Sequence, residues 1–362
     1  MLLGQAQPET YEAQLEEKIQ VTLEEFKSFN PPELEVFRSP AEHFRMRAEF
    51  KIWHENGEAH YAMFKQGEYK KPVKIEQFSI GSEKIVALMP ALLKAINADE
   101  LLKLKLFQVE FLTSTTGDAV ISMIYHKPLN ENWQNTATTL SETLQCKIIG
   151  RSRKQKIVIS EDFITERFQL SNGVFSYQQV ETGFTQPNAS VCQHMLNWAI
   201  QNSANLGGDL LELYCGNGNF TLPLSRNFNR VLATEVSKTS VHSAQYNIQK
   251  NDISNITIAR LSSEEFTQAL NKEREFRRLK DIPLDDYQFS TVFVDPPRAG
   301  LDADTEQMVA RFDNILYISC NPHTLQDNLT GLCKSHDIKA MALFDQFPYT
   351  DHRECGVLLK RK

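Results

Sequence analysis

The sequence predicts an α/β protein in two parts: a mixed antiparallel α+β region over residues 1–180 and a doubly wound, mostly parallel sheet over residues 181–362. In the first part, apolar and polar residues alternate from Arg45 to Trp53, which is the period of a half-buried strand. In the second part, short apolar runs alternate with helical stretches, a rhythm typical of parallel βαβ units. The length of 362 residues allows two domains.

The first part begins with an amphipathic helix, predicted over residues 9–29 and ended by Pro31-Pro32. We interpret this helix as ordinary packing. After the alternating strand, Asn56-Gly57 predicts a tight hairpin turn followed by a return strand. The other predicted elements are strands at 106–112, 119–125 and 157–159, a pair of strands around 172–173, and a helix near 133–145.

The second part alternates strands and helices. The predicted order is helix 191–204, strand 209–213, strand 231–234, helix 240–250, strand 291–294, helix 305–311 and strand 315–319. Because open parallel sheets bind ligands at the carboxyl ends of their strands, we expect the functional residues there. Residues 272–281 are charged and have no clear period, so they predict an exposed insertion.

Bulk composition narrows the class of protein. The chain is 41% apolar and 23% charged, as in ordinary globular proteins, and no apolar run approaches the roughly 20 residues of a membrane span. The net charge of −7 is unfavourable for binding nucleic acid, so any such surface must be local. Six scattered cysteines without a Cys-x-x-Cys pair argue against a zinc or iron–sulfur site and favour a cytoplasmic protein with reduced thiols.

A glycine turn follows the strand at 209–213. Gly216 and Gly218 let the backbone turn and let a ligand approach it, but the third glycine of the dinucleotide fingerprint is replaced by Thr221. Glu235 follows the next strand, where a carboxylate can accept both hydroxyl protons of a ribose. This combination favours S-adenosylmethionine over NAD, and the alternative is a tight turn with a surface glutamate.

A cysteine and two acids lie directly at the ends of other predicted apolar strands. Asp295 lies on an Asp-Pro-Pro turn, Cys320 precedes Asn321-Pro322, and Glu354 precedes a final apolar strand. A thiolate that adds to carbon 6 of uracil makes carbon 5 nucleophilic, and a base must then remove the carbon-5 proton. One cysteine and one acid suffice for this chemistry, although a free cysteine is more often a small buried hydrophobic residue.

Several motifs resemble the RNA uracil-5 methyltransferase family along the whole chain: ELYCGNGNF, FTQPN, DPPRAGLD, YISCNP and FDQFPYTDHRECGVLL. RSPAEHFRMRAEF and HKPLNENW resemble its bacterial tRNA-modifying subgroup. Ribosomal-RNA relatives usually carry an added oligonucleotide-binding barrel and a four-cysteine iron–sulfur cluster. This chain has neither, which favours tRNA as the substrate.

The resemblance implies an RNA-binding domain at 1–180 and a Rossmann-like, S-adenosyl-L-methionine-dependent methyltransferase domain at 181–362. It implies methylation of the T-loop uridine (U54) of tRNA, and also of the T-arm-like part of tmRNA, and we expect a monomer. By resemblance, Cys320 forms a covalent adduct with carbon 6, and Glu354 removes the carbon-5 proton. The implied cofactor pocket contains Gln186, Tyr214, Asn219, Glu235 and Asp295.

The resemblance also makes Phe107 a candidate stacking platform for a flipped base. Its alternative is a core position, since it lies in an apolar run. Arg45, Arg47 and Lys51 lie on one face of the alternating strand and are candidates for phosphate contacts, as is a second basic cluster. That second cluster consists of Arg151, Arg153, Lys154 and Lys156. A solvated strand face is the alternative, and for His126 both a polar contact and a plain strand end stay open.

Two other functions remain open from the sequence. One is methylation of ribosomal-RNA uridine or of cytosine, although Glu354 has no evident role with cytosine. The other is an RNA-binding folding factor that opens the tRNA elbow, a function that would survive Cys320→Ala.

Overall fold

The computed structural model describes residues 3–65 and 67–362, which form two compact units that share the chain in alternating segments. Unit 1 comprises the chain up to Glu9, Pro40–Arg167 and Gln179–Ala189. Unit 2 comprises Thr10–Ser39, Phe168–Gln178 and Ser190–Lys362. A single boundary between residues 180 and 181 therefore does not describe the division, because residues 10–39 and 168–178 fall in unit 2.

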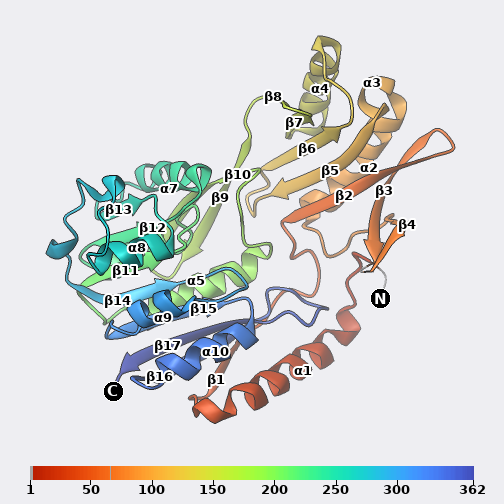
Figure 1. Ribbon diagram of the computed structural model, residues 1–362. Helices are drawn as coiled ribbons and strands as arrows, with labels where there is room; N and C mark the ends of the chain where they lie inside the picture. Colours follow the sequence, from red (N-terminus) through yellow and green to blue (C-terminus); the bar gives the residue numbers. More distant parts are fainter. Residues whose placement is uncertain (1–2, 66) are drawn as a thin grey trace. The chain divides into compact units, whose positions relative to one another are not determined.

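Unit 1 is built on a sheet with the strand order β4-β3-β2-β5-β6-β7-β8. Its neighbours are antiparallel except β6 and β7, which are parallel and joined through α4. The strands are β2 (Arg47–Glu55), β3 (Glu58–Lys65), β4 (Glu68–Lys74), β5 (Leu106–Thr113), β6 (Ala119–Tyr125), β7 (Lys147–Ser152) and β8 (Gln155–Val158), and the helices are α2 (Glu83–Ala98), α3 (Glu100–Lys103) and α4 (Glu131–Leu144) (Figure 1). The predicted hairpin is confirmed, since Asn56 and Gly57 have positive φ angles of 52° and 83°, as a two-residue turn requires.

A hairpin of β9 (Phe163–Leu170) and β10 (Gly173–Val180) contains residues of both units. The predicted turn around residues 172–173 is confirmed at its tip, where Gly173 has φ 144°. Asn172 fixes this turn by donating its side-chain amide to the Pro223 carbonyl at 2.9 Å.

Unit 2 is the predicted doubly wound sheet, with the order β1-β16-β17-β15-β14-β11-β12-β13. The pairings from β13 to β15 are parallel, β17 is antiparallel to both of its neighbours, and β1 runs parallel to β16. The strands are β1 (Leu34–Phe37), β11 (Asp209–Leu213), β12 (Val231–Thr234), β13 (Ile256–Ala259), β14 (Phe289–Val294), β15 (Asn314–Ser319), β16 (His336–Phe344) and β17 (Glu354–Arg361). The pairing of β1 with β16 is the reason that an N-terminal segment belongs to unit 2.

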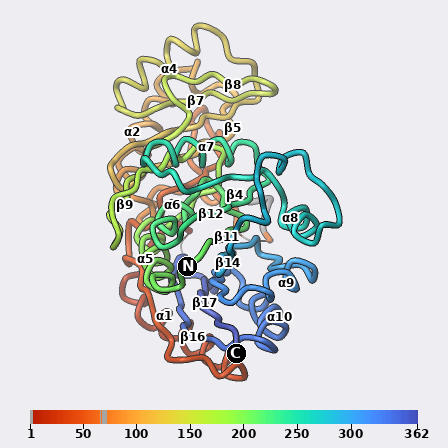
Figure 2. Tube along the Cα trace, turned by 90° about the vertical axis from the view of Figure 1, so that its left-hand side faces the viewer, coloured from red at the N-terminus to blue at the C-terminus, as the bar shows by residue number. Residues whose placement is uncertain are grey.

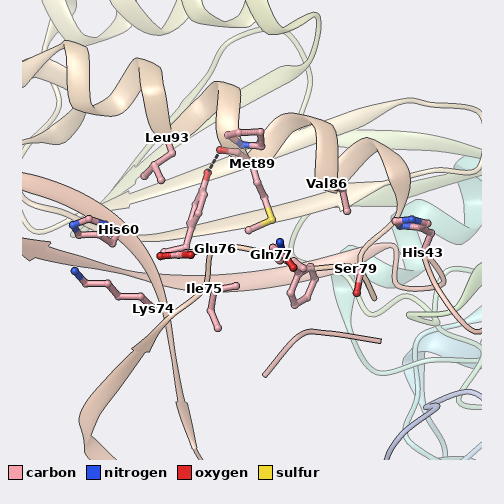
Figure 3. Close-up of a pocket in the computed structure, with 13 residues that line it drawn as sticks. His43, His60, Lys74, Ile75, Glu76, Gln77, Ser79, Val86, Met89 and Leu93 are labelled. Carbon is pink, nitrogen blue, oxygen red and sulfur yellow. Dashed lines mark hydrogen bonds between the residues drawn. The ribbon is translucent and has the colours of Figure 1, made fainter. Parts of the chain in front are cut away.

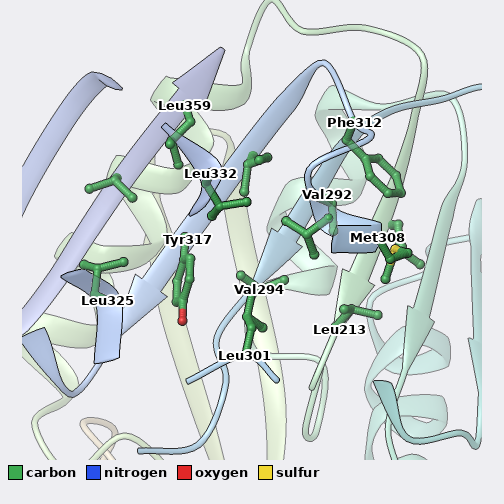
Figure 4. Packing of buried hydrophobic residues seen from close by; sticks show 14 of the residues in the cluster. Leu213, Val292, Val294, Leu301, Met308, Phe312, Tyr317, Leu325, Leu332 and Leu359 are labelled. Carbon is green, nitrogen blue, oxygen red and sulfur yellow. The ribbon is translucent and has the colours of Figure 1, made fainter. Parts of the chain in front are cut away.

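The helices of unit 2 cover both faces of this sheet. They are α1 (Pro8–Phe26), α5 (Ala189–Ser203), α6 (Thr221–Leu224), α7 (Lys238–Lys250), α8 (Ser263–Leu270), α9 (Ala303–Val309) and α10 (Pro322–Leu332), with short 3₁₀ turns at η1 (Lys27–Phe29), η2 (Ser225–Asn227), η3 (Arg277–Leu279) and η4 (Leu284–Asp286). Val292 and Val294 of β14 pack with Met308 and Leu325 from α9 and α10 (Figure 4). Phe293 points to the other face and meets Phe220, which immediately precedes α6, at 4.6 Å between ring centroids.

The charged stretch at 272–281 is only partly the exposed insertion that the sequence predicted. Its charged residues are exposed, whereas Phe276 and Leu279 are buried in the core of unit 2. These two apolar side chains anchor the segment, so for them the prediction was wrong.

Candidate active site

The carboxyl ends of adjacent strands bring three of the predicted residues into one row. In the parallel register, Glu212 pairs with Ala233, and Leu213 pairs with Val294. The residues that follow these strands, Glu235, Tyr214 and Asp295, are therefore aligned across β12, β11 and β14. This is the edge where open α/β sheets bind their ligands.

Cys320 and Glu354 meet across the antiparallel pair β15 and β17. Ser319 pairs with Cys355, so the next position in this register sets Cys320 opposite Glu354. Glu354 is 3% exposed, whereas the Cys320 side chain is half-buried. Burial, with the nearby Glu354 and Asp295 carboxylates, raises the pKa of the Cys320 thiol to about 11. Cys320 is therefore a neutral thiol at rest.

The pKa values of the two acids beside Cys320, Asp295 and Glu354, are both raised. Burial raises the pKa of Asp295 to about 7. Burial and the Asp295 carboxylate raise the pKa of Glu354 well above its usual range. A carboxylate with a raised pKa is a stronger proton acceptor, which suits Glu354 to general-base chemistry.

The glycine turn combines a tightly packed position with an open one. A Cβ atom at Gly218 would lie 2.7 Å from Leu222 Cδ1, so this position must be glycine for the turn to pack on α6. At Gly216, where φ is 57°, a Cβ atom would meet no heavy atom of the described residues within 4 Å. The backbone N–H of Gly216 donates to Glu235 Oε2 at 3.0 Å, and Ser237 N–H donates to Glu235 Oε1 at 2.7 Å. The Glu235 carboxylate is thus fixed beside open space at the turn.

Tyr214 and Asn219 flank the same turn. Tyr214 has a positive φ of 61°, donates its hydroxyl to Ser263 Oγ at 2.7 Å, and has a pKa raised to about 12 by burial. The Asn219 side chain lies 3.5 Å from Cys192 Sγ, and its carbonyl accepts from the Tyr177 hydroxyl at 3.1 Å. The structure therefore gathers Tyr214, Asn219, Glu235 and Asp295 in unit 2.

Glu212 is a further candidate site residue that the sequence analysis did not name. This carboxyl in β11 is 1% exposed, and its Oε2 has no hydrogen-bond partner among the described residues. Burial and the Asp295 carboxylate raise its pKa to about 8. The signal was available, because an acid inside the apolar run Leu210-Leu211-Glu212-Leu213 needs a reason to be buried.

These residues fit S-adenosylmethionine. The open side of Gly216 leaves room for a ligand, Glu235 offers carboxylate oxygens to ribose hydroxyls, and Glu212 and Asp295 are acids suited to a cation. Gln186 belongs to unit 1, in the segment between β10 and α5, and is half-buried. Its membership of the cofactor pocket stays a prediction.

The RNA-contact candidates in unit 1 divide into exposed and structural side chains. Phe107 is 38% exposed, so it is not a core residue. Its ring stacks on His126 at 4.3 Å with a 24° interplanar angle, and Lys51 Nζ lies 4.1 Å from the ring centroid. By contrast, Arg45 donates to the Arg47 carbonyl, and Arg47 donates to the Gly183 and Glu181 carbonyls, which fixes these two guanidinium groups to the backbone.

The second basic cluster is largely neutralised. Glu181, 3% exposed, pairs with Arg151 and lies 3.0 Å from Lys156 Nζ. Arg153 and Lys154 are exposed and follow the strand β7. Of the two basic groups, Arg153 and Lys154 are therefore the exposed side chains, whereas Lys51 is half-buried and its ammonium donates to Gln108 Oε1.

Unit 1 also contains a cavity of about 510 Å³ between β3, the segment that follows β4, and α2 (Figure 3). In the wall of this cavity, the Tyr61 hydroxyl donates to the Met89 carbonyl at 3.0 Å. The lining is mainly apolar and includes Leu93, Ile75 and Phe78. None of the residues predicted for catalysis or cofactor binding lines this cavity.

In the described part of the chain, no group of three or more His, Cys, Asp or Glu side chains is arranged to hold a metal ion. Likewise, no helix in it combines the length and apolar character needed to cross a membrane.

The sheet order, the glycine turn and the acid after β12 define the class of protein as a Rossmann-like methyltransferase. The fold is similar to that of a *Pyrococcus abyssi* tRNA (uracil-54, C5)-methyltransferase crystallised with S-adenosyl-L-homocysteine, with a TM-score of 0.73 at 19% identity over 96% of this chain and 83% of that chain. The family model described as tRNA (Uracil-5-)-methyltransferase matches residues 10–362, and the chain belongs to this family. The resemblance predicted from the motifs is thereby confirmed.

Two relatives span nearly the whole chain. The *Saccharophagus degradans* protein is 64% identical over 361 residues, covering 99% of each chain. The *Acinetobacter baumannii* protein is 53% identical over 357 residues, covering 97% of this chain and 99% of the relative. Both are named tRNA/tmRNA (uracil-C(5))-methyltransferase.

Proposed function

We propose that this chain transfers the methyl group of S-adenosyl-L-methionine to carbon 5 of the T-loop uridine, U54, of tRNA. The observation that carries the proposal is that Cys320 and Glu354 face each other across the antiparallel pair β15 and β17. The Asp295 carboxylate lies close enough to raise the pKa of Cys320. Membership of the tRNA (uracil-5-)-methyltransferase family supports the substrate. Because its relatives are named for both RNAs, we include the T-arm-like part of tmRNA.

The reaction follows from the residues at this edge. The Cys320 thiolate forms a bond to carbon 6, which places the electron pair on carbon 5 and its neighbouring carbonyl. S-adenosylmethionine, when bound, would supply an electrophilic methyl group to carbon 5 and leave as the neutral thioether after its sulfur–methyl bond breaks. Glu354 then takes the carbon-5 proton, the carbon–sulfur bond breaks, and Cys320 leaves as the thiolate. The net change at the base is one methyl group gained and one proton lost.

The raised pKa of Cys320 sets a condition on this reaction. With a pKa of about 11, the thiol must lose its proton within the assembled site. The Glu354 and Asp295 carboxylates oppose that loss, so protonation of Asp295, or a positive charge placed beside the two acids, favours the thiolate, while Glu354 must be ionised to accept the carbon-5 proton. We infer that the nucleophile is activated only when the site is filled.

In unit 1, we propose that Phe107 is the aromatic platform for an RNA base. Its exposed ring is backed by His126 and flanked by Lys51, so it offers a stacking face beside a positive charge. Lys51, Arg153 and Lys154 would then contact phosphates. Because the whole chain has a net charge of −7, we expect RNA binding to be confined to such local basic surfaces.

We further propose a cytoplasmic monomer. The six cysteines are all free thiols, and such thiols persist in a reducing compartment. Sedimentation of the purified protein with and without tRNA tests the oligomeric state, and a dimer in either condition contradicts this part of the proposal.

The test of the function is nucleoside mass spectrometry on an unmodified tRNA transcript incubated with the protein and S-adenosylmethionine. We expect one 5-methyluridine, confined to the T-loop fragment, and none in a transcript that carries cytidine at position 54. Transfer to ribosomal RNA instead of tRNA would contradict the proposed substrate. Binding of tRNA without transfer to any RNA would contradict the proposed chemistry.

A further inference from the structure

Helix α1 presents a stripe of polar and aromatic side chains to the segment that leads to Glu354. The stripe consists of Tyr11, Gln14, Lys18, Thr22 and Glu25, which recur every three or four residues and therefore share one helical face. The segment, residues 345–353, connects β16 to β17. Figures 1 and 2 show α1, in red, alongside the blue C-terminal strands of the same unit.

The first contact is a buried ion pair at the start of this segment. Lys18 Nζ donates to Asp345 Oδ1 at 2.8 Å and to the Phe347 carbonyl at 2.9 Å. The two side chains are 5% and 0% exposed. Removing one partner of such a pair leaves an uncompensated buried charge, so the lysine fixes Asp345 and the backbone two residues beyond it.

The second contact holds the middle of the segment. Gln14 acts as a clasp, because its Oε1 accepts from Tyr349 N–H and its Nε2 donates to the Thr350 carbonyl, each at 2.8 Å. Tyr349 has a positive φ of 63°, a conformation that costs free energy and persists only with support from its surroundings. The Tyr11 ring also packs edge-on against the Tyr349 ring at 6.1 Å.

The third contact lies next to Glu354. Arg353 makes a two-point ion pair with Glu25, with distances of 2.7 and 3.0 Å, and donates to Thr22 Oγ1 at 3.2 Å. Arg353 is only 9% exposed, and planar two-point pairs of this kind fix direction as well as distance. The residue before Glu354 is thus immobilised by the helix.

We propose that α1 positions the general base: through Lys18, Gln14 and the Glu25–Arg353 pair it holds residues 345–353 so that the Glu354 carboxylate is aimed at the pyrimidine. This proposal rests on the role of Glu354 in the proposed function. Cys320 does not depend on these contacts, because it follows β15 and is fixed by the sheet and by α10. Loosening α1 should therefore slow proton removal while leaving thiol addition and methyl transfer in place.

The test uses three variants of the full-length protein with tRNA and S-adenosylmethionine. Lys18→Met removes the buried ammonium, Gln14→Ala removes the clasp at a half-buried position that tolerates alanine, and Lys27→Met is the matched control. Lys27 lies just past the same helix, and its exposed side chain is in an ion pair with Glu24. Covalent protein–RNA adduct is measured on a denaturing gel, together with turnover and thermal stability.

We expect Lys18→Met and Gln14→Ala to lower turnover, by about 100-fold and 10-fold, since a 1 Å misplacement of a catalytic group can cost about 100-fold. Both should accumulate methylated adduct, whereas Lys27→Met should match the parent. In Lys18→Met/Asp345→Asn the unpaired charge is gone, so thermal stability should recover while adduct still accumulates. Recovery of normal turnover in this double variant would reduce the contact to a stability role and overturn the proposal.

Glu354→Gln separates the two proposals. If Glu354→Gln traps adduct but folded Gln14→Ala and Lys18→Met do not, the positioning role of α1 is wrong and the proposed reaction stands. If Glu354→Gln itself traps none, Glu354 is not the base, and both proposals fail.

Discussion

Cys320 is held by local structure, whereas Glu354 depends on a helix from the opposite end of the chain. Cys320 follows a buried strand with hydrogen-bonded neighbours on both sides, and Asn321-Pro322 starts α10 directly after it. Glu354 follows a segment without regular structure that contacts α1 some 330 positions away, as in the 331-residue separation of Thr22 and Arg353. The proposed nucleophile can therefore be recognised from nearby residues, while the placement of the proposed base is a property of the whole unit.

The largest effect is expected at the nucleophile. Cys320→Ser should lower turnover by at least about 10³-fold, because the hydroxyl is a far weaker nucleophile than the thiolate. The affinity for S-adenosylmethionine should stay within about twofold, since Cys320 follows β15, whereas the glycine turn and Glu235 follow β11 and β12, on the other side of β14 in the sheet. Calorimetry of cofactor binding beside a turnover assay checks both values. Normal turnover would exclude the covalent mechanism.

The base should give the next largest effect. Glu354→Gln removes the proton acceptor but keeps the shape of the side chain, and general bases contribute about 10²–10⁴-fold. Turnover should fall by that factor, while a single round of methyl transfer to the RNA slows much less. Rapid quenching with radiolabelled methyl donor separates the two rates, and an equal loss in both would assign Glu354 a role before proton removal.

Substrate binding in unit 1 should be separable from the chemistry in unit 2. Phe107→Ala should weaken tRNA binding by about 1–3 kcal/mol, the usual contribution of one stacked base, while Phe107→Trp should bind as the parent does. At saturating tRNA, adduct formation by Phe107→Ala should be close to normal. Unchanged affinity, measured by filter binding at fixed salt, would remove Phe107 from the RNA surface.

The electrostatic coupling of the catalytic pair predicts a smaller effect. Since the Glu354 carboxylate raises the pKa of Cys320, Glu354→Gln should lower that pKa from about 11 and speed alkylation of the thiol at pH 9. The measurement is the rate of iodoacetamide labelling of Cys320 against pH, read by peptide mass spectrometry. A pKa that is unchanged or higher in Glu354→Gln would show that the two groups are not coupled.

The smallest expected effect is a pH-dependent change in folding stability caused by the buried acid Glu212. The pKa of Glu212 is raised to about 8 in the folded chain, above the value of about 4.3 for a free glutamate, so the folded state holds a proton that the unfolded state releases. Its contribution to stability is complete below about pH 4 and is lost as the pH rises through 8. Glu212→Gln should therefore raise the melting temperature relative to the parent at pH 8.5 more than at pH 5, and the reverse trend would contradict the buried acid.

Much of this site could be predicted because its residues lie at strand ends. Cys320, Asp295 and Glu235 each come directly after a short, mainly apolar strand, and the parallel register then aligns those ends. Glu354 was found through the family motif, and the register confirms that it starts β17 opposite Cys320. The α/β class and the doubly wound sheet followed from the same alternation.

The features that could not be predicted depend on contacts between residues far apart in the sequence, or on a helical pattern interrupted by a proline. The interpretation of α1 as ordinary packing missed Lys18, because a lysine on an apolar face gives no sign of its partner Asp345. Helix α2 was not assigned, since Pro90 interrupts a segment whose Ile85, Leu88, Met89, Leu92 and Ile96 are buried. Arg45 and Arg47 looked like free cations, but their partners are backbone carbonyls at 181–183 and at Arg47 itself.

In the proposed reaction, Cys320 adds to the base and Glu354 completes the turnover. Intact mass spectrometry of Glu354→Gln after incubation with a T-arm transcript and S-adenosylmethionine tests it most directly. We predict a protein–RNA species that carries the transferred methyl group and maps to Cys320 after digestion. Free methylated RNA formed at the parent rate, or a link to any other residue, would contradict the covalent mechanism with Glu354 as the base.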